Sequence, residues 1–205
     1  MCYTASMGEA HDKIIGFYDK HIDEFGSGPR AVGWGDKHSQ EARFGAMCRV
    51  GDLEGKSILD VGCGLGDFYA YLTGHYGHVD YTGIDINPRY IEKARQLRPA
   101  AHFAVADFGE YAGGPFDYVV ASGIFSVKIP EYKNIYFGQI KKMFALARKG
   151  VAFTMLDAAH HPNDETYAAY SIEEVRGLCR SLTDDVVVYH DYLPHDFTMV
   201  LKRRG

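Results

Sequence analysis

Residues 58–67 read ILDVGCGLGD, a short apolar run that passes directly into a glycine-rich turn. An apolar run of this length is typical of a buried strand, and glycines let the backbone turn sharply and let a ligand lie against it. If the segment after the turn is helical, its first N–H groups favour polar or negatively charged ligand atoms. The stretch therefore predicts a strand, a turn and a helix that together hold a nucleotide-like cofactor.

Two aspartates in this stretch indicate the kind of cofactor. The G-x-G-x-x-G pattern of dinucleotide-binding proteins, counted from Gly62, requires a glycine at position 67, where this chain has Asp67. A carboxylate beside the turn repels a pyrophosphate, whereas Asp60, two residues before Gly62, suits an ammonium group. We therefore expect a cofactor with an amino acid group and a ribose but no phosphate. A NAD-dependent oxidoreductase is kept as an alternative.

Outward from this stretch, apolar runs alternate with helical patterns, as in proteins built from βα units. The predicted strands are Ser57–Val61, Val79–Ile84, His102–Ala106, Phe116–Ala121, Gly150–Leu156, Asp185–His190 and Phe197–Lys202. Only a short turn, DYLPHD, separates the last two, which predicts an antiparallel hairpin. The expected fold is an α/β, doubly wound, seven-stranded mixed sheet, parallel except for a C-terminal antiparallel hairpin strand, with an N-terminal helical lid.

Helices are predicted from apolar periodicity and from capping residues. A short accessory helix is expected from the residues that share one helical face near the N-terminus: Ile14, Ile15, Tyr18, Ile22 and Phe25. Asn87-Pro88 predicts a helix start, and Ser171 with Glu174 three residues later predicts a capping box. We expect residues 1–50 to form the lid or substrate cap and residues 51–205 to form the cofactor-binding domain.

The glycine-rich stretch resembles motif I of the class I, Rossmann-like S-adenosylmethionine-dependent methyltransferases. The pattern D-x-G-x-G-x-G of that motif is complete in Asp60, Gly62, Gly64 and Gly66. The resemblance implies a Rossmann-like methyltransferase domain over residues 51–205 with S-adenosyl-L-methionine as its cofactor. It also implies in-line transfer of a methyl group, which such an enzyme assists mainly by aligning the acceptor and excluding water.

Three further predicted strand ends match the family's later motifs in the expected order. Asp85 and Ile86 follow the second strand, where a carboxylate accepts the ribose hydroxyls. Asp107 and Phe108 follow the third strand and resemble the residues at the adenine edge. Ser122 follows the fourth strand and, by the same resemblance, lies beside the methionine part of the cofactor.

Residues 34–44, WGDKHSQEARF, are similar to the segment that many small-molecule methyltransferases place over the cofactor. This similarity implies that Trp34 covers the site and that Arg43 pairs with the methionine carboxylate. His160 and His161 follow the fifth predicted strand, where loops face the substrate, and are candidates for a general base. Because the histidines do not have the HExxH spacing of a zinc site, we expect no metal.

The residues after the fourth strand bear on the acceptor. Methyltransferases that act on amide or exocyclic base nitrogens usually carry Asn-Pro-Pro-Tyr or Asp-Pro-Pro-Tyr there, whereas this chain has ASGI at 121–124. The formal net charge of −5, from 22 Lys+Arg against 27 Asp+Glu, disfavours a nucleic-acid acceptor. Aromatic-rich loops at 126–136 and 158–170 suit a small, partly apolar or cationic acceptor. The motifs leave O-, N-, S- and C-methylation open.

Composition places the protein among ordinary globular domains, since its 205 residues are 46% hydrophobic and suffice for one sizeable core. The cysteines form no CxxC pair, and no apolar run or leader-like start suggests membrane insertion or export. We therefore expect a cytoplasmic enzyme without a membrane or nucleic-acid partner. A catalytically idle, cofactor-binding subunit of another methyltransferase is a further alternative, and the oligomeric state stays open.

Overall fold

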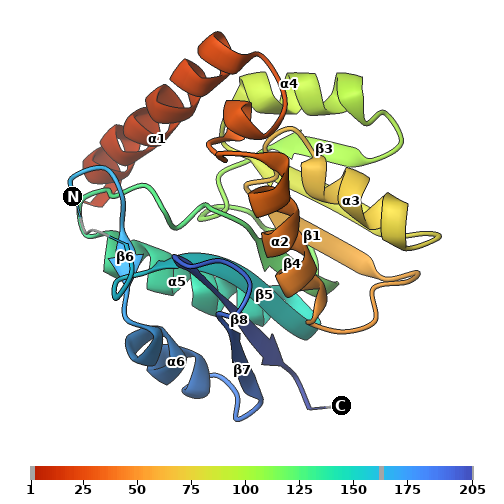
Figure 1. Ribbon diagram of the computed structural model, residues 1–205, viewed down its shortest axis with the longest axis vertical. Coiled ribbons are helices and arrows are strands. Elements are labelled where there is room, and N and C mark those ends of the chain that lie inside the picture. Colours follow the sequence, from red (N-terminus) through yellow and green to blue (C-terminus); the bar gives the residue numbers. More distant parts are fainter. Residues whose placement is uncertain (1–2, 162–163, 205) are drawn as a thin grey trace.

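The computed structural model describes residues 3–161 and 164–204, and within them eight strands form one sheet with helices on both faces (Figure 1). The strands are β1 Ser57–Val61, β2 Asp80–Asp85, β3 His102–Val105, β4 Phe116–Ala121, β5 Ala147–Asp157, β6 Ala169–Tyr170, β7 Val186–Tyr189 and β8 Asp196–Lys202. Along the sheet they lie in the order β3-β2-β1-β4-β5-β8-β7, with β6 beside β5. The strand order reverses between β1 and β4, which is where open α/β sheets form a binding crevice.

The strand directions confirm the predicted mixed sheet. β8 pairs antiparallel with both β5 and β7, and the other pairings are parallel. The predicted strands match seven of the observed ones to within a few residues. The sequence did not indicate β6, because a strand of two residues carries too little pattern to be recognised.

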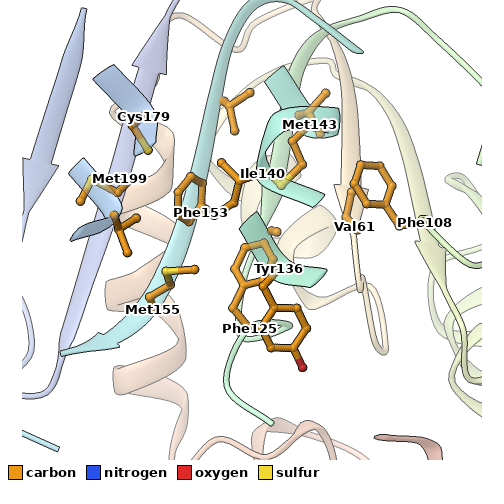
Figure 2. Packing of buried hydrophobic residues seen from close by; sticks show 14 of the residues in the cluster. Val61, Phe108, Phe125, Tyr136, Ile140, Met143, Phe153, Met155, Cys179 and Met199 are labelled. Atoms are coloured by element: carbon orange, nitrogen blue, oxygen red, sulfur yellow. The ribbon is translucent and has the colours of Figure 1, made fainter. Parts of the chain in front are cut away.

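The helices are α1 Tyr3–Phe25, α2 Lys37–Cys48, α3 Asp67–His75, α4 Pro88–Leu97, α5 Tyr132–Leu146 and α6 Ile172–Arg180, with a 3₁₀ turn, η1, at Pro29–Val32. Successive residues of the central strands pack on opposite faces of the sheet. Val119 belongs to the core beneath α5 and α6, whereas its neighbour Val120 packs with residues of α2, α3 and α4. Figure 2 shows Ile140 and Met143 of α5 beside Phe153 of β5 in the first of these cores.

The two predicted helix starts have different outcomes. Asn87 caps α4 as predicted, because its side-chain oxygen accepts the N–H of Arg89 at 2.9 Å. Ser171 precedes α6, but its side chain makes no capping hydrogen bond, so the predicted capping box is wrong. The carboxylate of Glu174 instead accepts from Nζ of Lys133 on α5, at 2.7 and 2.9 Å, and a charged donor is a stronger partner than a backbone N–H.

The first helix, α1, is longer than the short accessory helix that the apolar periodicity predicts, with 23 residues. It extends from the neighbourhood of β6 towards α4 (Figure 1). At the α4 end, Oδ1 of Asp19 accepts from Nδ2 of Asn87 at 2.8 Å, and Arg89 pairs with Asp23. None of the helices in the described ranges is long and apolar enough to cross a membrane.

Candidate cofactor site

The glycine-rich loop between β1 and α3 is tied to the end of the neighbouring strand. The N–H groups of Gly62 and Cys63 both donate to the carbonyl oxygen of Ile84, at 2.8 and 3.0 Å. Gly66 is the N-cap residue of α3 and adopts a left-handed conformation with φ of 73°. Because α3 starts at the next residue, the positive end of its dipole lies at this loop.

Asp85, the last residue of β2, is oriented by the same loop. Its Oδ2 accepts the N–H of Gly64 at 3.0 Å, and its Oδ1 accepts the N–H of Asn87 at 2.9 Å. Burial raises the pKa of Asp85 to about 6, although these backbone hydrogen bonds oppose the rise. The carboxylate is thus fixed before any ligand arrives, and its remaining lone pairs can accept hydroxyl groups.

Asp60 lies within β1 with only 3% of its surface exposed. The hydroxyl of Tyr81 donates to its Oδ2 at 2.5 Å. Burial raises the pKa of Asp60 to about 7, against the effect of that hydrogen bond, and the nearby carboxylates of Asp85 and Asp67 add to the rise. A cationic group in contact with Asp60 would favour its ionised form.

Asp60→Asn is expected to stabilise the ligand-free protein more at pH 8 than at pH 5. Since the folded-state pKa of about 7 lies above the ordinary value of 3.8, folded Asp60 retains a proton that the unfolded chain has already released. The ionisation of Asp60 therefore lowers the free energy of unfolding as the pH rises towards 7. Asparagine does not ionise, so the variant avoids this loss. The extra gain at pH 8 should be about 2 to 3 kcal/mol. Urea unfolding at both pH values measures it, and an equal effect at the two would contradict the argument.

These elements enclose a cavity of about 1080 Å³, including the space at its mouth, that adjoins β1, β2 and β4. Most of the residues predicted to bind the cofactor line it: Trp34, Asp60, Gly62, Gly64, Asp85, Ile86, Asp107, Phe108 and Ser122. The Oγ of Ser122 is buried and has no hydrogen-bond partner within the described ranges. Buried polar atoms are normally paired, so this one is suited to bonding a ligand. The orphaned hydroxyl and the acidic, glycine-lined floor fit a cofactor that carries hydroxyl and ammonium groups.

The cavity has a second wall, which the sequence predicted only as segments, namely the cap at 1–50 and the loop that ends at residue 136. It comes from α1 and α5 and comprises His11, Ile14, Ile15, Tyr18, Tyr136 and Gln139. Nε2 of His11 lies 3.6 Å from Oδ2 of Asp107, so α1 reaches the floor residues directly. The apolar face of α1 is readable in the sequence, but periodicity does not tell which surface such a face covers.

Arg43 and Gly66 are predicted site residues that do not line the cavity. Gly66 acts through the backbone, as the cap of α3. The guanidinium of Arg43 is occupied by a different partner from the expected cofactor carboxylate. Its Nε and Nη2 donate to the two carboxylate oxygens of Asp196, at 2.9 and 2.6 Å, and its Nη1 donates to the carbonyl oxygen of Ser39 at 2.7 Å.

His160 and His161 also lie outside the cavity lining, so their role as a base stays a prediction. Nδ1 of His160 is 2.8 Å from Oδ2 of Asp157, at the end of β5. Burial raises the pKa of Asp157, but hydrogen bonds from the N–H of Ala159 and from His160 outweigh it and hold the pKa below the ordinary value. The ring of His161 packs 5.5 Å from that of Tyr167, centroid to centroid.

Comparisons with known proteins agree with this architecture. A family model described as a methyltransferase domain matches residues 58–150. The Mycobacterium tuberculosis protein "Putative methyltransferase Rv1506c" is 32% identical over 157 residues, which cover 72% of this chain and 93% of that protein.

Two solved structures share the fold over nearly the whole chain. Magnesium protoporphyrin IX methyltransferase from Synechocystis PCC 6803, with bound SAH, has a TM-score of 0.69 at 16% identity, covering 98% of this chain and 100% of that one. The 1,6-didemethyltoxoflavin-N1-methyltransferase of Burkholderia thailandensis, with bound S-adenosylhomocysteine, has a TM-score of 0.67 at 17% identity, covering 97% and 90%.

Proposed function

Because the chain belongs to the class I S-adenosylmethionine-dependent methyltransferases, we propose that it methylates a small molecule and that the cavity beside the glycine-rich loop holds the cofactor. The observation that carries the placement is Asp85, whose carboxylate is held by the N–H of Gly64 and faces the cavity. A fixed carboxylate at the end of β2 is suited to the two hydroxyls of a ribose. Asp60 and Asp67, which also line the cavity, disfavour the pyrophosphate of the alternative NAD cofactor.

Different lining residues bind different parts of the cofactor. Asp85 accepts the ribose hydroxyls, and Asp107 with Phe108 holds the adenine. Asp60 attracts the ammonium group, and the unpaired Oγ of Ser122 bonds the polar end of the methionine part. Arg43 takes no part in direct binding, because its guanidinium is already paired with Asp196.

When bound, S-adenosylmethionine supplies a methyl group on a positively charged sulfur. The chain's own task is to align the acceptor with that group and to exclude water. Trp34 and the residues of α1 that line the cavity cover the site and limit its contact with solvent. We extend this covering role to the whole N-terminal segment, residues 1–50, which acts as the lid over residues 51–205.

The second cavity wall supports a small, partly apolar acceptor. Ile14 and Ile15 of α1 and Tyr136 of α5 offer apolar and aromatic surface, and Gln139 offers a polar contact. Both solved neighbours are named as methyltransferases of small molecules, magnesium protoporphyrin IX and 1,6-didemethyltoxoflavin. Of the two predicted acceptor loops, 126–136 contributes Tyr136 to the lining, whereas no described residue of 158–170 lines the cavity, and residues 162 and 163 lie outside the described residues.

Two measurements test the proposal. Calorimetric titration with S-adenosylhomocysteine should give binding heat, and no heat would refute the placement of the cofactor. Incubation with methyl-labelled S-adenosylmethionine and a cell metabolite extract should label one or more small molecules. If the protein binds the cofactor but labels a compound only when another protein is added, it is an accessory subunit and the proposed independent activity is wrong.

A further inference from the structure

We propose that Arg43 and Asp196 form a positioning pair that holds Trp34 over the cavity, although neither member of the pair lines it. The inference rests on the proposed function, because the pair is taken to serve cofactor binding. It replaces the direct contact with a carboxylate that the sequence led us to expect for Arg43. It also gives the C-terminal strand β8 a part in forming the site.

Trp34 is seated against the end of β4. It lines the cavity, and a Cβ added to Gly123 would lie only 2.8 Å from Cη2 of the indole. Gly123 adopts φ of 85° and follows Ser122, whose unpaired hydroxyl faces the methionine part of the proposed site. The position of the indole therefore sets the shape of the cavity next to the methyl-transfer region.

Arg43 lies over the indole ring. The guanidinium carbon lies 4.2 Å from the centroid of the Trp34 ring, a cation–π distance. Hydrogen bonds to Asp196 and to the carbonyl oxygen of Ser39 engage Nε, Nη1 and Nη2, so the plane of the guanidinium is fixed. A guanidinium held in this position over the ring restricts the rotation of the indole.

Asp196 anchors this stack to the sheet. It is the first residue of β8, is 6% exposed, and lies opposite Leu156 of β5 in the antiparallel register. A buried ion pair gains little net stability over an apolar pair, because desolvation offsets the attraction. Its geometry is nevertheless specific, since both carboxylate oxygens are engaged by Arg43. A pair that fixes a geometry but adds little to the stability of the protein is suited to a positioning role.

The chain contains a matched control for this arrangement. Arg49 lies just after α2, its guanidinium carbon is 4.5 Å from the ring centroid of Tyr189, and its Nη1 is 3.4 Å from Oδ1 of Asp191. Arg49 thus makes the same two kinds of contact, to an aromatic ring and to an aspartate of the C-terminal region. Neither Arg49 nor its two partners line the cavity.

The test compares Arg43→Lys with Arg49→Lys. Lysine keeps the positive charge beside Asp196 but cannot both engage the two carboxylate oxygens and place a planar group over the indole. Trp34 is the only tryptophan, so fluorescence excited at a wavelength that the tyrosines do not absorb reports the surroundings of Trp34 alone. In Arg43→Lys the emission should move to longer wavelength, acrylamide quenching should increase, and the Kd for S-adenosylhomocysteine, measured by calorimetry, should rise about threefold to tenfold. Arg49→Lys should match the wild type in all of these.

Asp196→Asn is a second test of the pair. It leaves Arg43 without its charged partner, so the Trp34 emission should shift in the same direction as in Arg43→Lys. If that variant does not fold, Arg43→Lys still decides. Wild-type emission and a wild-type Kd for S-adenosylhomocysteine in Arg43→Lys would overturn the positioning role, and so would equal changes in Arg49→Lys. A wild-type protein that binds no S-adenosylhomocysteine refutes the cofactor site instead, and the emission of Trp34 distinguishes the two failures.

Discussion

Asp85→Ala is expected to abolish measurable binding of S-adenosylhomocysteine while the protein stays folded. The substitution removes the carboxylate assigned to the ribose and also the acceptor that holds the N–H of Gly64, so the loop loses its orientation. Loss of two hydrogen bonds to a charged group, each worth about 1.5 to 3 kcal/mol, corresponds to a drop in affinity of about 100-fold or more. Calorimetric titration measures the loss directly.

Asp80→Ala is the matched control for this experiment. Asp80 is the first residue of the same strand, β2, and its side chain is exposed at the opposite end from Asp85. Its removal should leave the binding heat as in the wild type. Circular dichroism establishes that both variants are folded. Full binding heat in a folded Asp85→Ala protein would show that the ribose lies elsewhere, and the assignment of the whole site would fail with it.

Gly66→Ala is expected to lower the free energy of unfolding by about 2 to 5 kcal/mol, through two separable effects. A left-handed conformation, with φ of 73°, is costly for any residue with a side chain. In addition, the new Cβ would lie 2.6 Å from Cζ of Phe103, a ring that is 2% exposed and has little room to move. The variant should therefore unfold at a much lower urea concentration than the wild type.

Gly55→Ala separates the two effects. Gly55 has a similar φ of 64°, but apart from its two chain neighbours no described residue has a heavy atom within 4 Å of the position of its Cβ. This variant should lose only the conformational part, about 1 to 2 kcal/mol. Urea unfolding of both proteins gives the contribution of the collision with Phe103 by difference. Equal losses in the two variants would mean that the Phe103 side of the loop is not packed as described.

The parts of the molecule that the sequence predicts well are those encoded locally. The strand–loop–helix unit around Gly62 and the positions of Asp85 and Asp107 at strand ends follow from patterns within a few residues of each. The sheet order then brings these residues to one cavity, since the carboxyl ends of parallel strands share an edge.

The parts that the sequence does not predict depend on contacts between distant segments. Arg43 and Asp196 are 153 positions apart, and nothing near either residue indicates the other. In the same way, the partner of Glu174 is Lys133 on another helix rather than the neighbouring Ser171. The cap at 1–50 was predicted as a segment, but the residues of α1 that line the cavity were not, because an amphipathic pattern encodes a buried face but not its target.

The place of β8 also affects the order in which the protein can assemble. β8 follows β5 and β7 in the sequence but lies between them in the sheet, and it carries Asp196 at its start. During synthesis from the N-terminus, the cofactor loop, α2 and Trp34 emerge long before β8, whose Asp196 pairs with Arg43 of α2. Until residues 196–202 leave the ribosome, β5 presents an unpaired edge and Arg43 lacks its partner. A nascent chain can therefore form the glycine-rich floor early, but its tryptophan is fixed only after residues 196–202 have been made.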